Sequence, residues 1–219
     1  MEQTRITAIV EAALMASDKP LSLDKLLRLF EAEQARPAKP DINEALNRIS
    51  AACEADDRGI ELKQVASGFR FQIKQDVAAS ISTLWEEKPQ RYSRALLETL
   101  ALIAYRQPIT RGDIEQVRGV AVSSHITKTL LERDWVQVIG HREVPGRPAL
   151  YATTRTFLDY FNLKSLDELP SLKELQDLDK IHPLLALEDA NQLPPVEPGE
   201  EAAGKEAGVE EETPAEKQG

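Results

Sequence analysis

Two stretches of the chain repeat each other: ALMASDKPLSLDKL at residues 13–26 and ALIAYRQPITRGDI at residues 101–114. They align without gaps at an offset of 88 residues. In each stretch a predicted helix ends before a proline, and a Ser or Thr two residues later is placed to cap the next helix. The chain therefore predicts two copies of one structural unit, and the sequence around each stretch indicates what that unit is.

The first copy, residues 1–88, predicts three helices followed by a β-hairpin. Apolar residues recur at helical spacing three times and then alternate on both sides of a Ser-Gly turn. The residues that fix the predicted boundaries are the cap Ser22, the loop 31–40, the helix-opening pair Asp41 and Glu44, the turn Ser67-Gly68, and Asp76, which can cap a closing helix.

The second copy, residues 89–170, follows the same order. A helix begins near Ser93, Thr110-Arg-Gly-Asp113 resembles a capping box, and Gly119 ends the helix that the box opens. A third helix is expected to turn Ile126, Leu130 and Leu131 toward the core. WVQVIG at 135–140 and ALYAT at 149–153 predict two strands, HREVPGRP at 141–148 predicts the loop between them, and Thr154 is placed to start a short final helix.

Three helices followed by a hairpin is the winged-helix pattern. The predicted fold class is mainly α with short β-hairpins: tandem winged-helix domains at residues 1–88 and 89–170, a leucine-rich extension at 171–192, and an acidic tail at 193–219. The tail has eight Glu against two Lys and no aromatic residue. Such a composition buries too little apolar surface to offset its ordering entropy, so the tail is predicted to be disordered.

An apolar residue occupies every third position from Leu163 to Leu187. A period of three drifts by about 60° per step around an α-helix, and Pro170 and Pro183 would interrupt one long helix. Two interpretations remain: the segment packs back on the second domain, or it docks a partner. The series is Leu163, Leu166, Leu169, Leu172, Leu175, Leu178, Ile181, Leu184 and Leu187.

Composition and motifs predict neither an enzyme nor a membrane protein. No apolar run reaches the roughly 18 to 20 residues that span a bilayer, and the single cysteine agrees with a reducing, cytoplasmic compartment. No phosphate-binding GxxxxGK[ST] loop occurs, and the three histidines lie far apart, so neither a cofactor nor a metal is expected. Cys53 falls on the apolar face of a predicted helix, where a buried thiol is expected.

A winged-helix transcription regulator that binds DNA is the alternative. The net charge of −10 opposes it, and the third helix of the first domain carries five carboxylates against Arg48. The corresponding helix of the second domain is near neutral, although its wing carries His141, Arg142 and Arg147. Either these wing residues make weak phosphate contacts or they solvate a turn, and neither domain is predicted to read a DNA sequence by itself.

At residues 101–120 and 129–172 the chain closely resembles the bacterial segregation and condensation protein B family. The stretches that carry the resemblance are AYRQPITR, IEQVRGV, VPGRPALYATT and FLDYFNLKSLDELP, whereas the first domain matches mainly in layout. VSSHITKT at 122–129 departs from the family pattern.

The resemblance implies a non-catalytic subunit of the bacterial SMC condensin complex. Such a subunit forms a homodimer, here through residues 1–88, and binds the kleisin subunit (segregation and condensation protein A), which bridges the SMC ATPase. It would be cytoplasmic and nucleoid-associated, without a cofactor, acting in chromosome condensation and segregation during cell division and touching DNA at most indirectly or weakly. The residues predicted to contact the kleisin are Tyr105, Arg106, Arg142 and Arg147.

Overall fold

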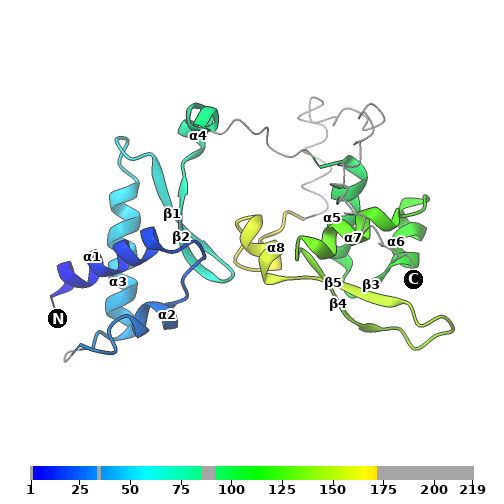
Figure 1. The fold of residues 1–219 in the computed structure, drawn as a ribbon, viewed down its shortest axis with the longest axis horizontal. Coiled ribbons are helices and arrows are strands. Elements are labelled where there is room, and N and C mark those ends of the chain that lie inside the picture. The colour runs from blue at the N-terminus through cyan, green and yellow to red at the C-terminus, as the bar shows by residue number, and fades with distance from the viewer. Residues whose placement is uncertain (1, 34–35, 85–91, 172–219) are drawn as a thin grey trace, which may run out of the picture. The chain divides into compact units, whose positions relative to one another are not determined.

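The computed structural model describes residues 2–33, 36–84 and 92–171, and its elements repeat one order twice (Figure 1). Three helices are followed by an antiparallel hairpin and a short helix in each half. The predicted fold class, mainly α with two small β-sheets in tandem winged-helix domains, is confirmed. The predicted boundary between residues 88 and 89 lies outside the described residues, as do 172–192 of the extension and the whole acidic tail.

The first domain buries one apolar cluster between its helices. Helix α1 turns Ile6, Val10 and Leu14 inward, and the hydroxyl of Ser22 accepts a hydrogen bond from the Lys25 amide at the start of α2. The ordered elements are α1 (Gln3–Ala16), α2 (Leu23–Arg28), α3 (Lys39–Cys53), β1 (Ile60–Val65), β2 (Gly68–Ile73), α4 (Gln75–Ile81) and the 3₁₀ helix η1 (Ser82–Leu84).

Helix α3 begins at Lys39, so the expectation that Asp41 opens it was wrong by two residues. Pro40 sits in the first turn, where its missing N–H costs no hydrogen bond, and this lets the helix start inside the predicted loop. Asp41 instead accepts a hydrogen bond from the Ala38 amide at 2.7 Å. The closing helix α4 likewise begins at Gln75, before the expected cap Asp76.

The hairpin of the first domain depends on Gly68. Strands β1 and β2 pair from Ile60 opposite Ile73 to Val65 opposite Gly68, and Leu21 forms an isolated bridge to Phe69. That bridge brings the Leu21 carbonyl so close that a Cβ on residue 68 would lie 2.2 Å from its oxygen. Gly68 also has φ +140°, a backbone conformation that other residues rarely adopt.

The second domain adds a strand that the sequence did not indicate. Strand β3 pairs with β5, and β5 with β4, so the sheet order is β3-β5-β4. The elements are α5 (Arg94–Arg106), β3 (Ile109–Thr110), α6 (Arg111–Arg118), α7 (Ser124–Glu132), β4 (Val136–His141), β5 (Ala149–Thr153), α8 (Arg155–Tyr160) and the 3₁₀ helix η2 (Leu166–Glu168). A two-residue strand leaves no alternation to recognise, which explains why the sequence did not predict it.

The predicted helix boundaries of the second domain are confirmed. Thr110 and Asp113 form the capping box, with the Thr110 hydroxyl accepting from the Asp113 amide at 3.2 Å and the Asp113 carboxylate accepting from the Thr110 amide at 3.0 Å. Gly119 ends α6 in the left-handed conformation, and Thr154 caps α8. Leu131 differs from the expectation: it points away from the core and is 38% exposed.

The repeat holds from the proline onward but not before it. Leu26 and Ile114, which the offset of 88 pairs, are both buried. Met15 and Ile103 are also paired, yet Met15 is 67% exposed whereas Ile103 is 2% exposed. Helix α5 continues to Arg106, two residues closer to its proline than the end of α1. The two first helices therefore turn different faces to their cores.

Candidate partner-binding face of the second domain

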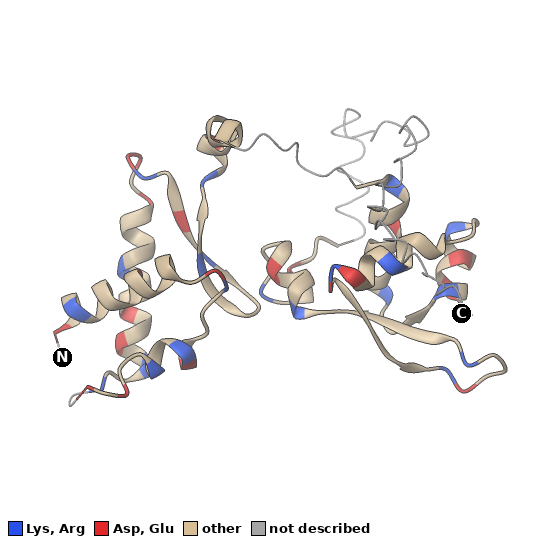
Figure 2. Cartoon of the chain, viewed as in Figure 1, with Lys and Arg blue, Asp and Glu red and all other residues tan. Residues whose placement is uncertain are grey.

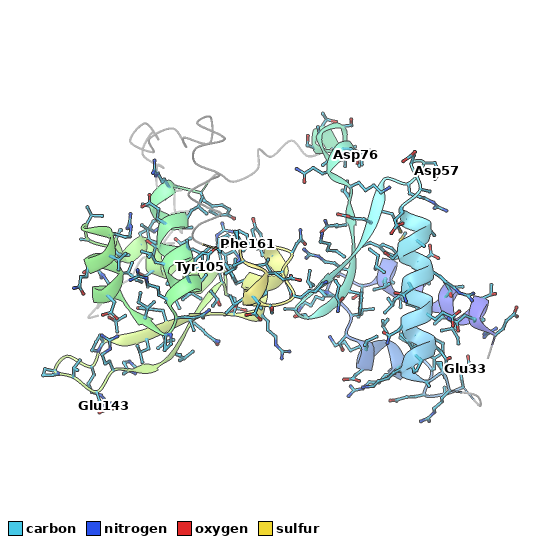
Figure 3. All side chains as sticks on the ribbon, turned by 180° about the vertical axis from the view of Figure 1, so that it is seen from behind. Glu33, Asp57, Asp76, Tyr105, Glu143 and Phe161 are labelled. Atoms are coloured by element: carbon cyan, nitrogen blue, oxygen red, sulfur yellow. The ribbon has the colours of Figure 1, made fainter. Side chains whose placement is uncertain are left out.

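The predicted contact residues Tyr105 and Arg106 form the last turn of α5 (Figure 3). The Tyr105 hydroxyl donates a hydrogen bond to the Pro170 carbonyl at 2.5 Å, so this side chain holds the chain that leaves the domain. Arg106 is exposed to solvent. Tyr105 thus has a structural role within the chain, which leaves the Arg106 guanidinium as the more accessible group of the two.

Arg142 lies at the start of the wing loop and binds back onto the domain. Its two terminal nitrogens lie 3.0 and 2.6 Å from the two carboxylate oxygens of Asp113. The Arg142 guanidinium, together with the Thr110 amide, holds the pKa of Asp113 well below its usual range. The pair connects the wing to the first turn of α6 and thereby positions the wing beside the helices.

Glu143, labelled in Figure 3, lies at the tip of the wing, and Arg147 pairs with it. Its guanidinium is 3.4 Å from the Glu143 carboxylate, and both side chains are largely exposed. An exposed pair of this kind contributes little to stability. Arg147 therefore remains available to a partner, whereas Arg142 would first have to release Asp113.

A cavity of about 350 Å³ opens on the face of the second domain formed by α6, α7 and β5. Leu131 and Tyr151 supply its apolar lining. Tyr151 is flanked across the sheet by Val138 and Ile109, and of these Val138 is exposed while Ile109 is buried. An apolar strip therefore runs from the core to the surface. The lining residues are Arg111, Ser124, Thr127, Lys128, Leu131, Glu132 and Tyr151.

The charges beside this cavity are paired. Arg111 lies 2.9 Å from Glu115, and Lys128 lies 3.6 Å from Glu132. Glu115 also accepts a hydrogen bond from the Val122 amide, which, with Arg111, lowers its pKa. In the view of Figure 2, blue and red residues are interspersed over these helices and at the wing tip.

The third helix of a winged-helix domain is the one that DNA-binding members insert into the major groove. Here that helix is α7, and its exposed residues are Ser124, His125, Leu131 and the Lys128–Glu132 pair. Arg133, just after α7, lies 4.8 Å from the ring centre of Tyr92 and so packs on an aromatic ring. The face can bury an apolar side chain, but it offers few unpaired cations to a phosphate backbone.

The described residues hold one cysteine and no cluster of metal-binding side chains. Among residues 2–33, 36–84 and 92–171, no three His, Cys, Asp or Glu lie close enough to hold a metal ion. Cys53 is buried, and burial raises the pKa of its thiol above the ordinary value. In the same part of the chain, no helix combines the length and apolar character needed to cross a bilayer.

None of the four predicted contact residues lines the cavity in the described chain. The sequence did not predict this cavity, because the helical pattern assigned Leu131 to the core. One signal was present: Ile126 and Leu130 are four residues apart and share a helix face, whereas Leu131 lies about 100° away from Leu130. The helical spacing thus places Leu131 on a different face of the helix from the two core-facing residues.

Comparison with known proteins gives one consistent family. The model of the family "Segregation and condensation complex subunit ScpB" matches residues 8–172. A segregation and condensation protein B homolog from Coxiella burnetii is 54% identical over 177 residues, covering 81% of this chain and 83% of the relative. A segregation and condensation protein B from Syntrophotalea carbinolica is 41% identical, covering 81% and 87%.

Among solved structures, the chain is similar to ScpB from Mycobacterium tuberculosis, with 29% identity and a TM-score of 0.35, covering 74% of this chain and 98% of that one.

Proposed function

This chain belongs to the family of the segregation and condensation complex subunit ScpB, and on that basis we propose that it is a non-catalytic subunit of a bacterial SMC condensin complex. In this role it binds the kleisin subunit, segregation and condensation protein A, and through it the SMC ATPase. It acts in chromosome condensation and segregation, and it is located in the cytoplasm in association with the nucleoid. It catalyses no reaction of its own.

The observation that carries the proposal is the apolar cavity on the exposed side of α7. A cavity that offers Leu131 and Tyr151 fits an apolar side chain of a peptide, and the paired charges around it can give orientation without attracting a polyanion. Helix-in-groove and extended-peptide recognition both use such an apolar anchor point. The wing, fixed by Asp113 and Arg142, provides a second wall for the bound segment.

The proposed contact set keeps Arg106 and Arg147, which are exposed, and adds the cavity residues. Arg142 and Tyr105 contribute indirectly, since Arg142 positions the wing and Tyr105 holds the chain exit. Charge reversal at Arg147 is expected to weaken kleisin capture and leave the fold unchanged, because this side chain is 71% exposed and its pair is weak.

A homodimer formed through residues 1–88 is part of the proposal. Support comes from apolar surface on the first domain: Met15, Leu29 and Leu84 are exposed, and none of the described residues of α4 is buried. Such surface is more usual in an interface than on a free monomer. Light scattering at tens of micromolar should give the mass of a dimer, and a monomer at that concentration would contradict this part of the proposal.

The alternative, a winged-helix transcription regulator, has weaker support. Exposed ion pairs bring the net charge of α7 and of the α6 start close to zero, so few phosphates would be neutralised. Retention of the purified protein on DNA at about 150 mM salt would favour the regulator. The proposed function expects elution well below that salt concentration.

The central experiment is co-purification with the kleisin and titration of its middle region. Leu131→Glu places a charge in the apolar cavity and should weaken binding at least tenfold. Val117→Glu is the matched control, because Val117 is also exposed on a helix of the second domain, at 44%, but does not line the cavity. Binding that survives Leu131→Glu unchanged would place the interface elsewhere, and a wild-type protein that fails to bind would contradict the function.

A further inference from the structure

The side chains that α7 contributes to the cavity change in character along the helix. Ser124, Thr127, Lys128 and Leu131 follow one another at helical spacing, so they form one stripe of α7. The stripe is polar from Ser124 to Lys128 and apolar at Leu131. A helix rises about 1.5 Å per residue, so the two ends of the stripe are about 10 Å apart along the axis. The cavity therefore has a polar end and an apolar end.

Arg111 lies at the polar end, and its terminal nitrogens are available to a partner. Its Nε lies 2.9 Å from a Glu115 carboxylate oxygen, and that oxygen also accepts a hydrogen bond from the Val122 amide at 2.9 Å. Glu115 is thus fixed to the backbone and engages only the Nε side of the guanidinium. Nη1 makes a long contact of 3.4 Å to the Ser124 hydroxyl, and Nη2 donates no hydrogen bond to any residue that the structure describes. The guanidinium is therefore oriented, with donors left for a ligand.

Lys128 adds a second cation to the cavity. Its Nζ lies 3.6 Å from the Glu132 carboxylate, which is an ion pair but too long for a hydrogen bond, and its side chain is 72% exposed. The lining as a whole has two cations, Arg111 and Lys128, against one carboxylate, Glu132. One added negative charge suits this arrangement, whereas the many charges of a phosphate backbone would also meet Glu132 and the Glu115 beside Arg111.

We propose that the cavity selects its kleisin segment by two groups together: an apolar side chain that packs on Leu131 and Tyr151, and an Asp or Glu carboxylate that binds the terminal nitrogens of Arg111 beside the Lys128 ammonium. This selection rests on the proposed function and names the chemistry of the segment that the function requires. A carboxylate bound by a guanidinium accepts charge-assisted hydrogen bonds, which are stronger and more directional than those between neutral groups. Arg111 then determines specificity, while Leu131 supplies apolar contact.

The length of the α7 stripe sets the spacing of the two groups in the partner. Groups about 10 Å apart are about three residues apart in an extended strand, which advances about 3.3 Å per residue, or about seven apart on one face of a helix. The recognition element is therefore an acidic residue and an apolar residue at one of these two separations. A segment that lacks the acidic residue would fill the apolar end of the cavity and leave Arg111 to solvent.

The repeat of the two domains agrees with a binding role for Arg111. The offset of 88 residues pairs Arg111 with Leu23, which packs against the core of the first domain. The second domain keeps a capping residue just before this position, Thr110 where the first has Ser22, and has an exposed cation in place of the packed leucine. An exposed ion pair such as Arg111–Glu115 contributes little to stability, so recognition accounts for the cation better than folding does.

Titration of the kleisin middle region tests Arg111 against a matched control. Arg94 and Glu98 form a second pair four residues apart, with the same Nε–carboxylate distance of 2.9 Å, and they do not line the cavity. Arg111→Gln should weaken binding about tenfold, whereas Arg94→Gln should leave the affinity unchanged. Both variants should keep the wild-type melting temperature. Equal affinities of wild type and Arg111→Gln would overturn the inference, and so would a melting temperature that falls sharply in Arg111→Gln alone, since that indicates a structural role.

Salt dependence separates the two groups of the bound segment. Raising sodium chloride from about 50 to about 500 mM should bring the affinity of wild type toward that of Arg111→Gln, because screening weakens an exposed charge pair. Leu131→Ala removes apolar surface without adding a charge, so its affinity should stay below that of wild type by a similar factor at both concentrations. A ratio of wild type to Arg111→Gln that does not change with salt would contradict a charge-assisted contact.

A charge exchange identifies the acidic residue and separates this inference from the proposed function. Each Asp and Glu of the kleisin middle region is replaced by Lys in turn and titrated with Arg111→Glu. One replacement should restore binding about tenfold, about three or seven residues from the apolar side chain whose truncation adds nothing to Leu131→Ala. Failure of every replacement to restore binding would overturn the inference and leave the function standing. Absence of kleisin binding by wild type and Arg94→Gln alike would contradict the function, and the selection with it.

Discussion

The two winged-helix domains can be compared position by position around the proline turn, where the repeat aligns them, and several aligned residues there have different roles. Ser22 and Thr110 cap equivalent helices, but Thr110 also exchanges hydrogen bonds with Asp113, where the first domain has Lys25. Leu23 packs against the first core, whereas its counterpart Arg111 lies on the surface beside the cavity. The same position of the scaffold is thus apolar and packed in one domain and charged and exposed in the other.

The wings of the two domains also differ, in the length of the loop between their strands. In the first domain the strands turn within two residues, Ala66 and Ser67, and Gly68 lets the hairpin approach Leu21. In the second, a loop of seven residues separates β4 from β5 and is held at its base by Asp113 and Arg142. A tight hairpin contributes rigidity, whereas a long wing provides surface, so the comparison predicts where each domain tolerates change.

The largest expected effect is that of Gly68→Ala. A Cβ would lie 2.2 Å from the Leu21 carbonyl oxygen at a φ of +140°, so the hairpin or the turn at Leu21 must move. We expect a loss of about 3 kcal/mol or more for the first domain. Gly146→Ala in the second wing is the control: φ is +83°, no atom lies within 4 Å, and a loss of about 1 kcal/mol is expected. Hydrogen exchange resolved by peptide measures each domain, and equal effects would remove the proposed difference between the wings.

The next effect concerns the first helices. Ile103→Ala should cost about 2–4 kcal/mol because the Ile103 side chain is buried, while Met15→Ala should stay within about 0.5 kcal/mol because the Met15 side chain is exposed. Urea denaturation monitored in both domains measures the difference. A large cost at Met15 in the dimer, with none in a monomeric variant, would show instead that this face is buried between copies.

A smaller effect distinguishes the two helix caps. Thr110→Ala should cost about 1–2 kcal/mol, since it removes one member of a reciprocal pair, whereas Ser22→Ala should cost about 0.5–1 kcal/mol for a single exposed bond. The measurement is the change in unfolding free energy of the domain concerned. Identical costs would show that the reciprocal bonds of Asp113 add nothing to the cap.

The smallest effect depends on pH and should occur in the second domain alone. Arg142 and Thr110 lower the pKa of folded Asp113, so the folded state favours the carboxylate. Its contribution is complete above about pH 4 and is lost as the pH falls through the lowered value. Stability of the wild-type second domain should therefore fall more steeply below pH 4 than that of Asp113→Asn. Parallel pH profiles of the two proteins would contradict this assignment.

The local elements were predictable because each depends on neighbours in the chain. The caps Ser22, Ser93, Thr110 and Thr154 and the stop at Gly119 act over one helical turn, so residue identity and spacing determine them. The start of α3 was misplaced because Pro40 is compatible with both a loop and a first helical turn. The partner-binding residues remain predictions, and the cavity was not predicted at all.

By itself the sequence determined the fold class, because hydrophobic period and capping residues agree along both halves of the chain. Only the tertiary structure decided which surface is open. It turned Leu131 away from the core, paired Arg142 with Asp113 across 29 residues of sequence, and brought Tyr151 beside α7. These relations join residues that are distant in the chain, so they follow from the packing of the helices against the sheet and cannot be obtained from the spacing of residues along the sequence.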